Sequence, residues 1–461
     1  MPLRETAPKL PAEQYEKNFA DITPPMTHRQ AAIEATRCLF CFDAPCTKAC
    51  PTHIDVPAFI KKITTGNLRG SARVILEANI LGESCGRVCP TEVLCEGACV
   101  MHEKGEKAIE IGRLQRYAVD YVLDHNVRMF RAGAPNGKRV ACIGSGPASL
   151  AAAAELARWG YRVTIMDKND LAGGLNTYGI AAYKTRASDS LREVELVRQL
   201  GVEFRQKTQV GRDISFADLE KQFDAIFIGV GLGETWALEL PGEDLQGVCG
   251  AIEFIEKTKA QPFERVEVGR RVACVGAGNT AIDVVTAARR LGSESVYLIY
   301  RRSEQEMPAF RYEYDLAKQD GVVFLWQTQP VRVLGCDGVV TELECVRTRP
   351  GAPDAKGRRA PAVIPGSEFT IEVDMVVRAV GQKPATEFLR AVRGIEVRKD
   401  GTVALNERHQ TGNAKYFAGG DCANGGKEVV DAVAEGMAAA RGLDAWLGSP
   451  RGEIETTDEH R

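Results

Sequence analysis

The sequence predicts an α/β fold in which an N-terminal α-helical domain precedes two Rossmann-like nucleotide-binding domains. Two observations predict it. Residues 1–135 contain amphipathic helix-like segments, such as PAFIKKITTGNLRGSARVILEAN and IGRLQRYAVDYVLDH, with little strand pattern. Further along, the stretches that begin at Lys138 and Arg270 each have the order strand, glycine turn, helix and second strand.

These patterns divide the chain into segments. We expect a helical domain in residues 1–135 and a first Rossmann-like domain built from residues 136–232 and 384–448. A second Rossmann-like domain occupies residues 233–383, and residues 449–461 form a disordered tail. The polar linker RAGAPNGK marks the end of the helical domain.

The helical domain carries two groups of closely spaced cysteines. The first, C-x2-C-x4-C-x3-C-P, comprises Cys38, Cys41, Cys46 and Cys50. The second, C-x3-C-P-x4-C-x3-C, comprises Cys85, Cys89, Cys95 and Cys99. Such spacings let several thiolates converge on one metal centre, and a cysteine followed by proline recurs in cubane iron-sulfur ligation. Eight sulfurs are enough for two [4Fe-4S] clusters, which makes this an iron-sulfur domain.

Disulfides and structural zinc are the alternatives. The N-terminus has no apolar leader segment, so nothing favours the oxidising compartment that disulfides need. Two zinc sites of four thiolates each would satisfy the same spacing and stay open, although redox cofactors elsewhere in the chain favour iron. The six other cysteines are scattered singly, and we expect them to be buried.

Composition excludes several classes of function. The 59 basic and 62 acidic residues nearly balance, so no strong field favours nucleic acid or an anionic membrane. No stretch approaches the roughly 20 apolar residues of a membrane span. We therefore expect a soluble cytoplasmic protein.

The first glycine turn, Gly144-Ser145-Gly146-Pro147-Ala148, has the surroundings of a dinucleotide site. A strand precedes it, and a helix whose N-terminus can receive a pyrophosphate follows it. The next strand ends in Asp167, where a carboxylate accepts hydrogen bonds from an adenosine ribose. With the pair Gly173-Gly174 and the later YFAGGDCANGG, this pattern favours FAD.

The second glycine turn, Gly276 to Ala281, favours NADP. Its second strand ends in Arg301 and Arg302 instead of a carboxylate, and guanidinium groups match a 2'-phosphate. Arg311 is a candidate third member of this group. The alternative, that these arginines lie on a solvated loop, stays open.

The order RCLFCFDAPCTKACP, CGRVCPTEVLCEGAC, IGRLQR and two glycine turns resembles the N-terminal half of the dihydropyrimidine dehydrogenase family. In bacteria this half exists as a separate electron-input subunit. The resemblance covers about residues 30–445. Glutamate synthase small subunits are similar in architecture but have a different second cysteine group, and the LQ of IGRLQR favours the dehydrogenase branch.

The resemblance implies a ligand set. One cluster takes Cys38, Cys41, Cys46 and Cys99, and the other takes Cys50, Cys89, Cys95 and the amide oxygen of Gln115. Cys85 is left out, although spacing alone would make it the eighth ligand.

The resemblance also implies cofactor contacts. Flavin contacts fall on Gly144, Ser145, Gly146, Pro147, Ala148, Asp167, Gly173, Gly174, Leu175, Lys184, Val210, Gly419, Gly420, Asp421, Val429 and Val430. Dinucleotide contacts fall on Ala277, Gly278, Asn279, Thr280, Arg301, Arg302, Ala379, Val380 and Gly381. Pro308 stands where the fully fused family members have a further arginine, so NAD is not excluded.

The function that the resemblance implies is electron transfer from NAD(P)H, through FAD and two [4Fe-4S] clusters, to an FMN-containing partner that reduces uracil and thymine. We therefore expect a hetero-oligomer with a role in pyrimidine catabolism. No segment of this sequence matches the pyrimidine-reducing barrel, and we predict no catalytic acid or base in this chain, because cofactors supply the chemistry.

Three other functions are weighed against this one. The first is the NADPH-oxidising small subunit of glutamate synthase, or a related flavin-cluster oxidoreductase. The second is a redox-sensing or assembly module. The third, a thioredoxin-reductase-like enzyme, is disfavoured because no C-x2-C motif lies beyond the first domain.

Overall fold

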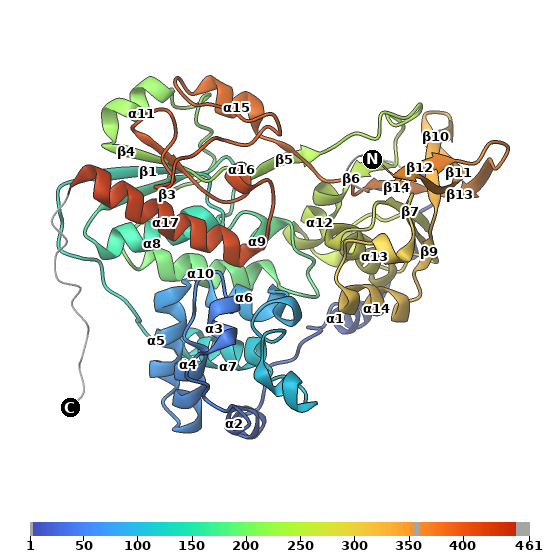
Figure 1. The fold of residues 1–461 in the computed structure, drawn as a ribbon. Helices are drawn as coiled ribbons and strands as arrows, with labels where there is room; N and C mark the ends of the chain where they lie inside the picture. Colours follow the sequence, from blue (N-terminus) through green and yellow to red (C-terminus); the bar gives the residue numbers. More distant parts are fainter. Residues whose placement is uncertain (1–2, 354–358, 449–461) are drawn as a thin grey trace. The chain divides into compact units, whose positions relative to one another are not determined.

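The computed structural model describes residues 3–353 and 359–448 (Figure 1). Its chain forms two compact units, described separately below. Unit 1 comprises residues 1–22, 178–186 and 233–383, and unit 2 comprises residues 23–177, 187–232 and those from 384 onward. The tail predicted at residues 449–461 lies outside the described residues.

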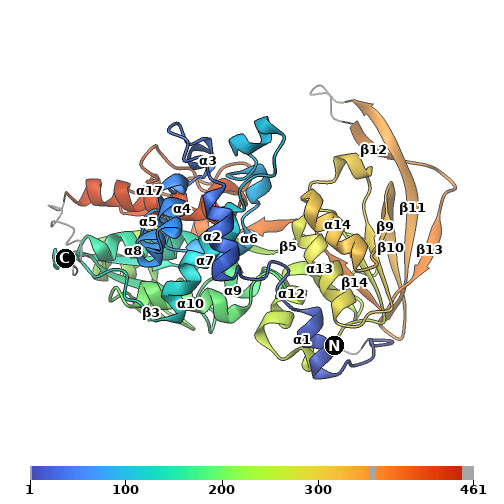
Figure 2. The same ribbon diagram turned by 90° about the horizontal axis from the view of Figure 1, so that it is seen from below.

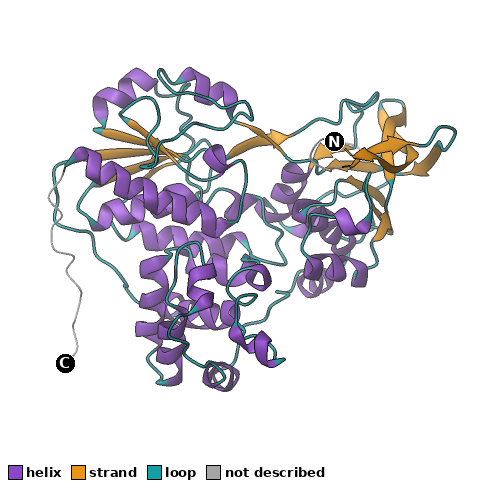
Figure 3. Ribbon diagram, in the orientation of Figure 1, coloured by secondary structure: helices purple, strands orange, loops and turns teal. Residues whose placement is uncertain are grey.

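The N-terminal part of unit 2 is helical and carries both cysteine groups (Figure 3). Its elements are α2 (His28–Thr36), α3 (Pro45–Ala49), α4 (Val56–Thr64), α5 (Leu68–Ala78), α6 (Gly82–Val88), η1 (Thr91–Val93), η2 (Val100–Lys104) and α7 (Ile111–Asp124). Helix α4 begins where the Asp55 carboxylate accepts a hydrogen bond from the Ala58 N–H at 3.0 Å. Its apolar face, which includes Phe59 and Ile60, enters a core that continues into the second part of the unit.

The second part of unit 2 contains a parallel sheet with the strand order β16-β4-β1-β2-β3. The strands are β1 (Arg139–Ile143), β2 (Arg162–Met166), β3 (Glu203–Arg205), β4 (Ala225–Ile228) and β16 (Tyr416–Ala418). The helices are α8 (Pro147–Arg158), α9 (Leu175–Tyr178), α10 (Ala187–Arg198), α11 (Phe216–Gln222), α15 (Thr386–Ala391), α16 (Asp421–Asn424) and α17 (Val429–Leu447).

Alternate residues of β1 face two different cores, as a two-residue period requires. Val140 and Cys142 belong to the core that contains residues of α8 and α17, which run side by side in Figure 1. Ala141 and Ile143 belong to the core that contains residues of α11 and α15. Helices thus cover both faces of the sheet, as expected of the predicted Rossmann-like domain.

Unit 1 contains a second parallel sheet, with the order β6-β14-β7-β8-β9. Its elements are α1 (Ala12–Asn18), β5 (Leu232–Thr235), β6 (Val248–Gly250), α12 (Ala251–Ala260), η3 (Phe263–Arg265), β7 (Arg271–Val275), α13 (Asn279–Arg290), β8 (Ser295–Ile299), η4 (Glu304–Glu306), α14 (Arg311–Gln319), β9 (Val323–Leu325), β10 (Thr328–Cys336), β11 (Val339–Pro353), β12 (Arg359–Val363), β13 (Phe369–Glu372), β14 (Met375–Arg378) and β15 (Gln382–Pro384). Figure 2 shows α12, α13 and α14 on one side of this sheet and the antiparallel strands β10 to β13 on the other.

Two short segments lie in a different unit from the one predicted. Residues 1–22 were expected in the helical domain, but α1 packs in unit 1, where the Phe19 ring stacks on Phe263 with centroids 4.1 Å apart. The Ala7 N–H also donates to the Val268 carbonyl at 2.9 Å. Residues 178–186 were expected in the first Rossmann-like domain and also belong to unit 1. Buried contacts, which the sequence pattern does not display, determine both placements.

Two further observations concern expectations from composition. Of the six cysteines outside the two groups, Cys336 is exposed, because it ends β10 at the turn into β11, and the other five are buried. Across residues 3–353 and 359–448, the structure contains no helix with the length and apolarity that a membrane crossing requires.

Candidate functional site

The first thiol set lines one cavity of unit 2. Its walls carry all four of Cys38, Cys41, Cys46 and Cys99, together with apolar side chains from α4 and α7. Burial raises the pKa of Cys46 to about 11, and the neighbouring Cys38 and Cys99 add to the rise. Cys99 comes from the second cysteine group, so the fold brings thiols from distant parts of the sequence to one place.

The second thiol set consists of Cys50, Cys85, Cys89 and Cys95. Burial raises the pKa of Cys89, and the other three thiols of the set raise it further. Cys85 lies within α6, where it is buried and accepts a hydrogen bond from the Asn79 amide at 3.1 Å. Burial also raises the pKa values of Cys85 and Cys95.

These thiols fit a cationic centre. A buried thiol among other thiols resists ionisation, whereas a metal ligand must be a thiolate, so an iron centre would supply the positive charge that these surroundings lack. Among the described residues, no group of three or more His, Cys, Asp or Glu side chains is arranged to hold a metal ion. The ligand assignment therefore stays a prediction.

Gln115, the other predicted ligand, lies on α7 next to α6. Its side chain is buried, and its Nε2 donates to the Gly82 carbonyl at 2.7 Å. The two helices approach closely, since a Cβ added to Gly86 would lie 3.0 Å from the Arg116 backbone nitrogen. The hydrogen bond to Gly82 thus orients the Gln115 amide across the contact between α6 and α7. Cys85 lies near the other thiols of the second set.

The first glycine turn joins β1 to α8 and requires its glycines. Gly144 has φ +90°, and a Cβ there would lie 2.5 Å from the Gly229 carbonyl oxygen. A Cβ on Gly174, at φ +58°, would lie 2.7 Å from the Gly146 Cα. The pair Gly173-Gly174, followed by Leu175, therefore lies directly against the turn that was predicted to receive a pyrophosphate.

Asp167 closes the same turn. One carboxylate oxygen accepts hydrogen bonds from the Ser145 N–H at 2.7 Å and the Ser145 hydroxyl at 2.6 Å. The other accepts from the Asn169 N–H at 2.8 Å. Because each carboxylate oxygen has two lone pairs, capacity for a ribose hydroxyl remains.

The C-terminal glycine turn meets the first one. A Cβ on Gly420 would lie 3.0 Å from the Ala148 Cβ, and one on Gly436 would lie 2.1 Å from the Ala148 carbonyl oxygen. Burial raises the pKa of Asp421. Gly419 and Val430 are buried beside this turn, Val429 begins α17, and Val210 is buried after β3. These glycine-lined turns form a cradle that fits FAD.

Lys184 belongs to unit 1, whereas the other predicted flavin residues belong to unit 2, so its flavin contact stays a prediction. Its buried ammonium group contacts Asp283 at 2.7 Å and Glu313 at 2.6 Å. Although burial lowers the pKa of Lys184, the two carboxylates raise it above its ordinary value. In this structure Lys184 stabilises the interior of unit 1.

The second glycine turn joins β7 to α13 at the carboxyl end of the parallel sheet of unit 1. A Cβ on Gly276, at φ +131°, would lie 2.2 Å from the Ala379 carbonyl oxygen. The turn residues Ala277 to Thr280 therefore share one edge of the sheet with Ala379, Val380 and Gly381. Asn279 accepts a hydrogen bond from the Phe310 N–H at 3.0 Å, which secures the loop before α14.

Trp236 is a neighbour of this site that the sequence does not single out. Its backbone N–H donates to the Gly381 carbonyl at 3.0 Å, and its side chain is 48% exposed. A lone tryptophan carries no spacing pattern, so only the pairing of β5 with β15 places it beside the predicted dinucleotide residues.

The three candidate arginines differ in their surroundings. Arg311 pairs with Glu304 at 2.9 Å and Asp315 at 3.3 Å, and its guanidinium lies over the Tyr314 ring. Arg301 is exposed and Arg302 half-buried directly after β8, and neither makes an ion pair with another residue that the structure describes. Arg301 and Arg302 are therefore available to an anion, whereas Arg311 is already engaged.

Comparison with known proteins places this geometry in a family. Residues 138–436 match the family model described as pyridine nucleotide-disulphide oxidoreductase, and residues 15–127 match dihydropyrimidine dehydrogenase domain II, 4Fe-4S cluster. The chain belongs to the pyridine nucleotide-disulphide oxidoreductase family. The second match favours iron-sulfur over zinc and disulfides for the cysteines of the helical domain.

Similar proteins extend along nearly the whole chain. The glutamate synthase [NADPH] small chain of Escherichia coli K12 is 37% identical over 96% of this chain and 97% of its own length. The putative oxidoreductase AegA of the same organism is 38% identical over 97% of this chain and 70% of its own. The NADP(+)-dependent formate dehydrogenase subunit beta of Moorella thermoacetica is 35% identical over 88% of this chain and 60% of its own.

Two solved structures share the fold. FprA of Mycobacterium tuberculosis in complex with NADPH has a TM-score of 0.56 and 21% identity over 68% of this chain and 85% of its own. The thioredoxin reductase of T. acidophilum has a TM-score of 0.51 and 20% identity over 68% of this chain and all of its own. These likenesses and the match of residues 138–436 confirm the two Rossmann-like domains, and the match of residues 15–127 confirms the helical domain that precedes them.

The comparisons favour the alternative branch, glutamate synthase, over the expected one. The sequence was expected to resemble dihydropyrimidine dehydrogenase more than glutamate synthase, yet that resemblance is found in residues 15–127, whereas glutamate synthase small chains match almost end to end. The LQ pair of IGRLQR therefore does not decide the branch. The chain is an oxidoreductase with an iron-sulfur domain, related to subunits of larger enzymes.

Proposed function

We propose that this chain is an electron-input subunit that oxidises NADPH and passes the electrons, through FAD and two [4Fe-4S] clusters, to a partner subunit of the glutamate synthase type. The observation that carries the proposal is the end-to-end similarity to glutamate synthase [NADPH] small chains. The two thiol sets and two glycine turns, all in one chain, support it.

The residues of unit 1 would bind the dinucleotide. The N–H groups of Ala277 to Thr280, at the start of α13, would receive its pyrophosphate. Arg301 and Arg302 would bind the 2'-phosphate, because neither is engaged by a carboxylate of the described residues. A preference for NADPH over NADH follows from this arrangement.

The residues of unit 2 would hold FAD and the clusters. The turn Gly144 to Ala148 would receive the pyrophosphate of FAD, Asp167 would accept a ribose hydroxyl, and the turn Gly419 to Asp421 would border the rest of the cofactor. When bound, FAD accepts two electrons from a nicotinamide and gives them up singly, as cubane clusters require. No side chain of this chain has to transfer a proton for that purpose.

A second candidate partner is an FMN-containing subunit that reduces uracil and thymine. The match of residues 15–127 to dihydropyrimidine dehydrogenase domain II favours it, as does the buried Gln115, which that family implies as a ligand. Both candidates share the same electron input and differ only in the acceptor.

Reconstitution with each partner tests the proposal. With a purified glutamate synthase large subunit, we expect glutamate formation that depends on NADPH and on this chain. With an FMN-containing pyrimidine reductase, uracil consumption would instead support the second candidate. The chain alone should reduce artificial electron acceptors with NADPH but neither form glutamate nor consume uracil. Failure to oxidise NADPH with any acceptor would overturn the proposal.

A further inference from the structure

The loop that carries Cys38, Cys41 and Cys46 orients its two phenylalanines in opposite ways. Phe40 is half-buried and packs against the core of unit 2, and the Lys61 ammonium lies 4.9 Å from its ring centroid. Phe42, two residues later, is fully exposed, at 106% of its reference area. A fully exposed phenylalanine makes no use of the favourable free energy that burial of its apolar side chain would contribute.

The backbone of this loop is held in an unfavourable conformation. Phe40 has φ +51° and Ala44 has φ +38°, both in the left-handed region that residues other than glycine rarely adopt. Such conformations are strained and cluster at functional sites. Phe42 lies between these two strained residues.

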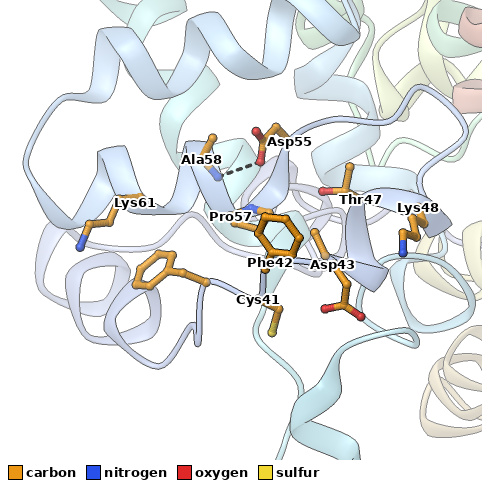
Figure 4. A pocket seen from close by; sticks show the side chains of 11 residues that line it. Cys41, Phe42, Asp43, Thr47, Lys48, Asp55, Pro57, Ala58 and Lys61 are labelled. Atoms are coloured by element: carbon orange, nitrogen blue, oxygen red, sulfur yellow. Dashed lines mark hydrogen bonds between the residues drawn. The ribbon is translucent and has the colours of Figure 1, made fainter.

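Phe42 borders an open pocket, shown in Figure 4. The apolar part of its lining comes from Phe40, Pro57 and Ala58, and Figure 4 shows Lys61 and Lys48 at opposite sides of the Phe42 ring. Neither lysine makes an ion pair within the described ranges. Asp43 and Asp55 line the same pocket, so its charged side chains are two ammonium groups and two carboxylates. Together, the residues Phe40, Phe42, Asp43, Lys48, Asp55, Pro57, Ala58 and Lys61 are called the Phe42 surface.

The Phe42 surface adjoins the first thiol set. Cys41 and Pro57 line both this pocket and the neighbouring cavity that holds Cys38, Cys46 and Cys99. A protein bound at the pocket would thus be separated from that thiol set by little more than the Cys41 segment itself. An exposed aromatic ring among apolar and charged neighbours is the usual composition of a protein interface centre and its rim.

We propose that the Phe42 surface is the docking site of the electron-accepting partner subunit, with the Phe42 ring inserted into an apolar recess of that subunit and a polar rim of mixed charge facing Lys48, Lys61, Asp43 and Asp55. This inference rests on the proposed function, because it assigns electron exit to the first thiol set. The relatives named as a small chain or a beta subunit are in keeping with a partner protein.

The test compares three full-length holoproteins: the wild type, Phe42→Asp and the control Val323→Asp. Val323 is an exposed apolar residue of the other unit, 46% exposed, on β9. The affinity of each for purified glutamate synthase large subunit is measured by biolayer interferometry. Phe42→Asp should weaken binding at least about thirtyfold, as expected for a central aromatic anchor, while Val323→Asp should leave it within about twofold.

Two further measurements separate this inference from the proposed function. Iron content and bleaching of the flavin by NADPH should be the same in all three proteins, because Phe42 is outside the cofactor residues. If the wild type is not bleached by NADPH, the proposed function fails. If all three are bleached and Phe42→Asp binds the partner as tightly as the wild type, the docking inference fails alone.

The remaining outcomes also decide the question. If the wild type binds no synthase subunit, the same comparison is made with the FMN-containing pyrimidine reductase, and absence of binding to both overturns the inference. A wild-type dimer in gel filtration that Phe42→Asp abolishes would make this surface an interface between copies of the chain, and would overturn it too.

Discussion

Replacing Arg301 and Arg302 together by alanine should lower kcat/KM for NADPH by about thirtyfold and leave NADH oxidation nearly unchanged. Arg302 is half-buried, so its charge-assisted contact with a phosphate is assigned about 1.5 kcal/mol. Arg301 is exposed, so its contact is assigned only about 0.5 kcal/mol. Their sum of about 2 kcal/mol corresponds to about thirtyfold at roughly 1.4 kcal/mol per factor of ten.

Arg311 provides the matched control for this double variant. Because Glu304 and Asp315 already engage its guanidinium, Arg311→Ala should change kcat/KM for NADPH by less than about threefold. The assay is steady-state reduction of an artificial electron acceptor with each dinucleotide. Equal losses with NADPH and NADH, a wild-type preference for NADH, or an Arg311→Ala loss as large as that of the double variant would refute the reasoning.

Three other predictions concern the cofactor residues and the interior. Cys85→Ser should keep about eight irons per chain by colorimetric iron analysis, whereas Gln115→Ala should lose about half of them. The reverse result would assign Cys85 as the eighth ligand. Gly174→Ala should purify with little flavin by absorbance, because its Cβ would lie 2.7 Å from the Gly146 Cα. The control Gly201→Ala, at φ +81° with nothing within 4 Å, should keep the flavin. Equal flavin in both variants would contradict the proposal that these glycine turns hold FAD. Glu193 lies on α10, where its buried carboxylate accepts hydrogen bonds from the Glu83 N–H at 2.8 Å and the Ser84 N–H at 3.0 Å. Burial raises the pKa of Glu193 above its ordinary value of 4.5, so the folded chain binds a proton that the unfolded chain releases, and the free energy of unfolding should fall as the pH rises from about 4.5 towards neutrality. Urea titrations of Glu193→Gln across this range should show a shallower fall, and an unchanged slope would count against the raised pKa.

The parts of the fold that follow a short-range pattern could be predicted from the sequence. Both strand-turn-helix units appear where glycines force close backbone approach, as at Gly144 and Gly276. The helical domain with its thiols was predicted because amphipathic periodicity and cysteine spacing are local properties. The convergence of Cys99 with Cys38 was accessible only through the family resemblance, since more than fifty residues of chain separate them.

The features that the sequence did not predict depend on long-range burial. Tyr15 and Phe19 are buried in the core of unit 1, although their segment was predicted to belong to the helical domain. Lys184 pairs with Asp283 and Glu313, each more than ninety residues away in the sequence. The exposure of Phe42 could not be predicted from the sequence, because no pattern shows which of Phe40 and Phe42 packs against the core.

The most direct test of electron flow is an anaerobic titration of the purified chain with NADPH, followed by visible absorbance and electron paramagnetic resonance. The account predicts that NADPH bleaches the flavin and produces the signal of a reduced [4Fe-4S] cluster without any partner present. A flavin that bleaches while the clusters stay oxidised, although dithionite reduces them, would show that the thiol sets do not receive electrons from NADPH, and would contradict the account.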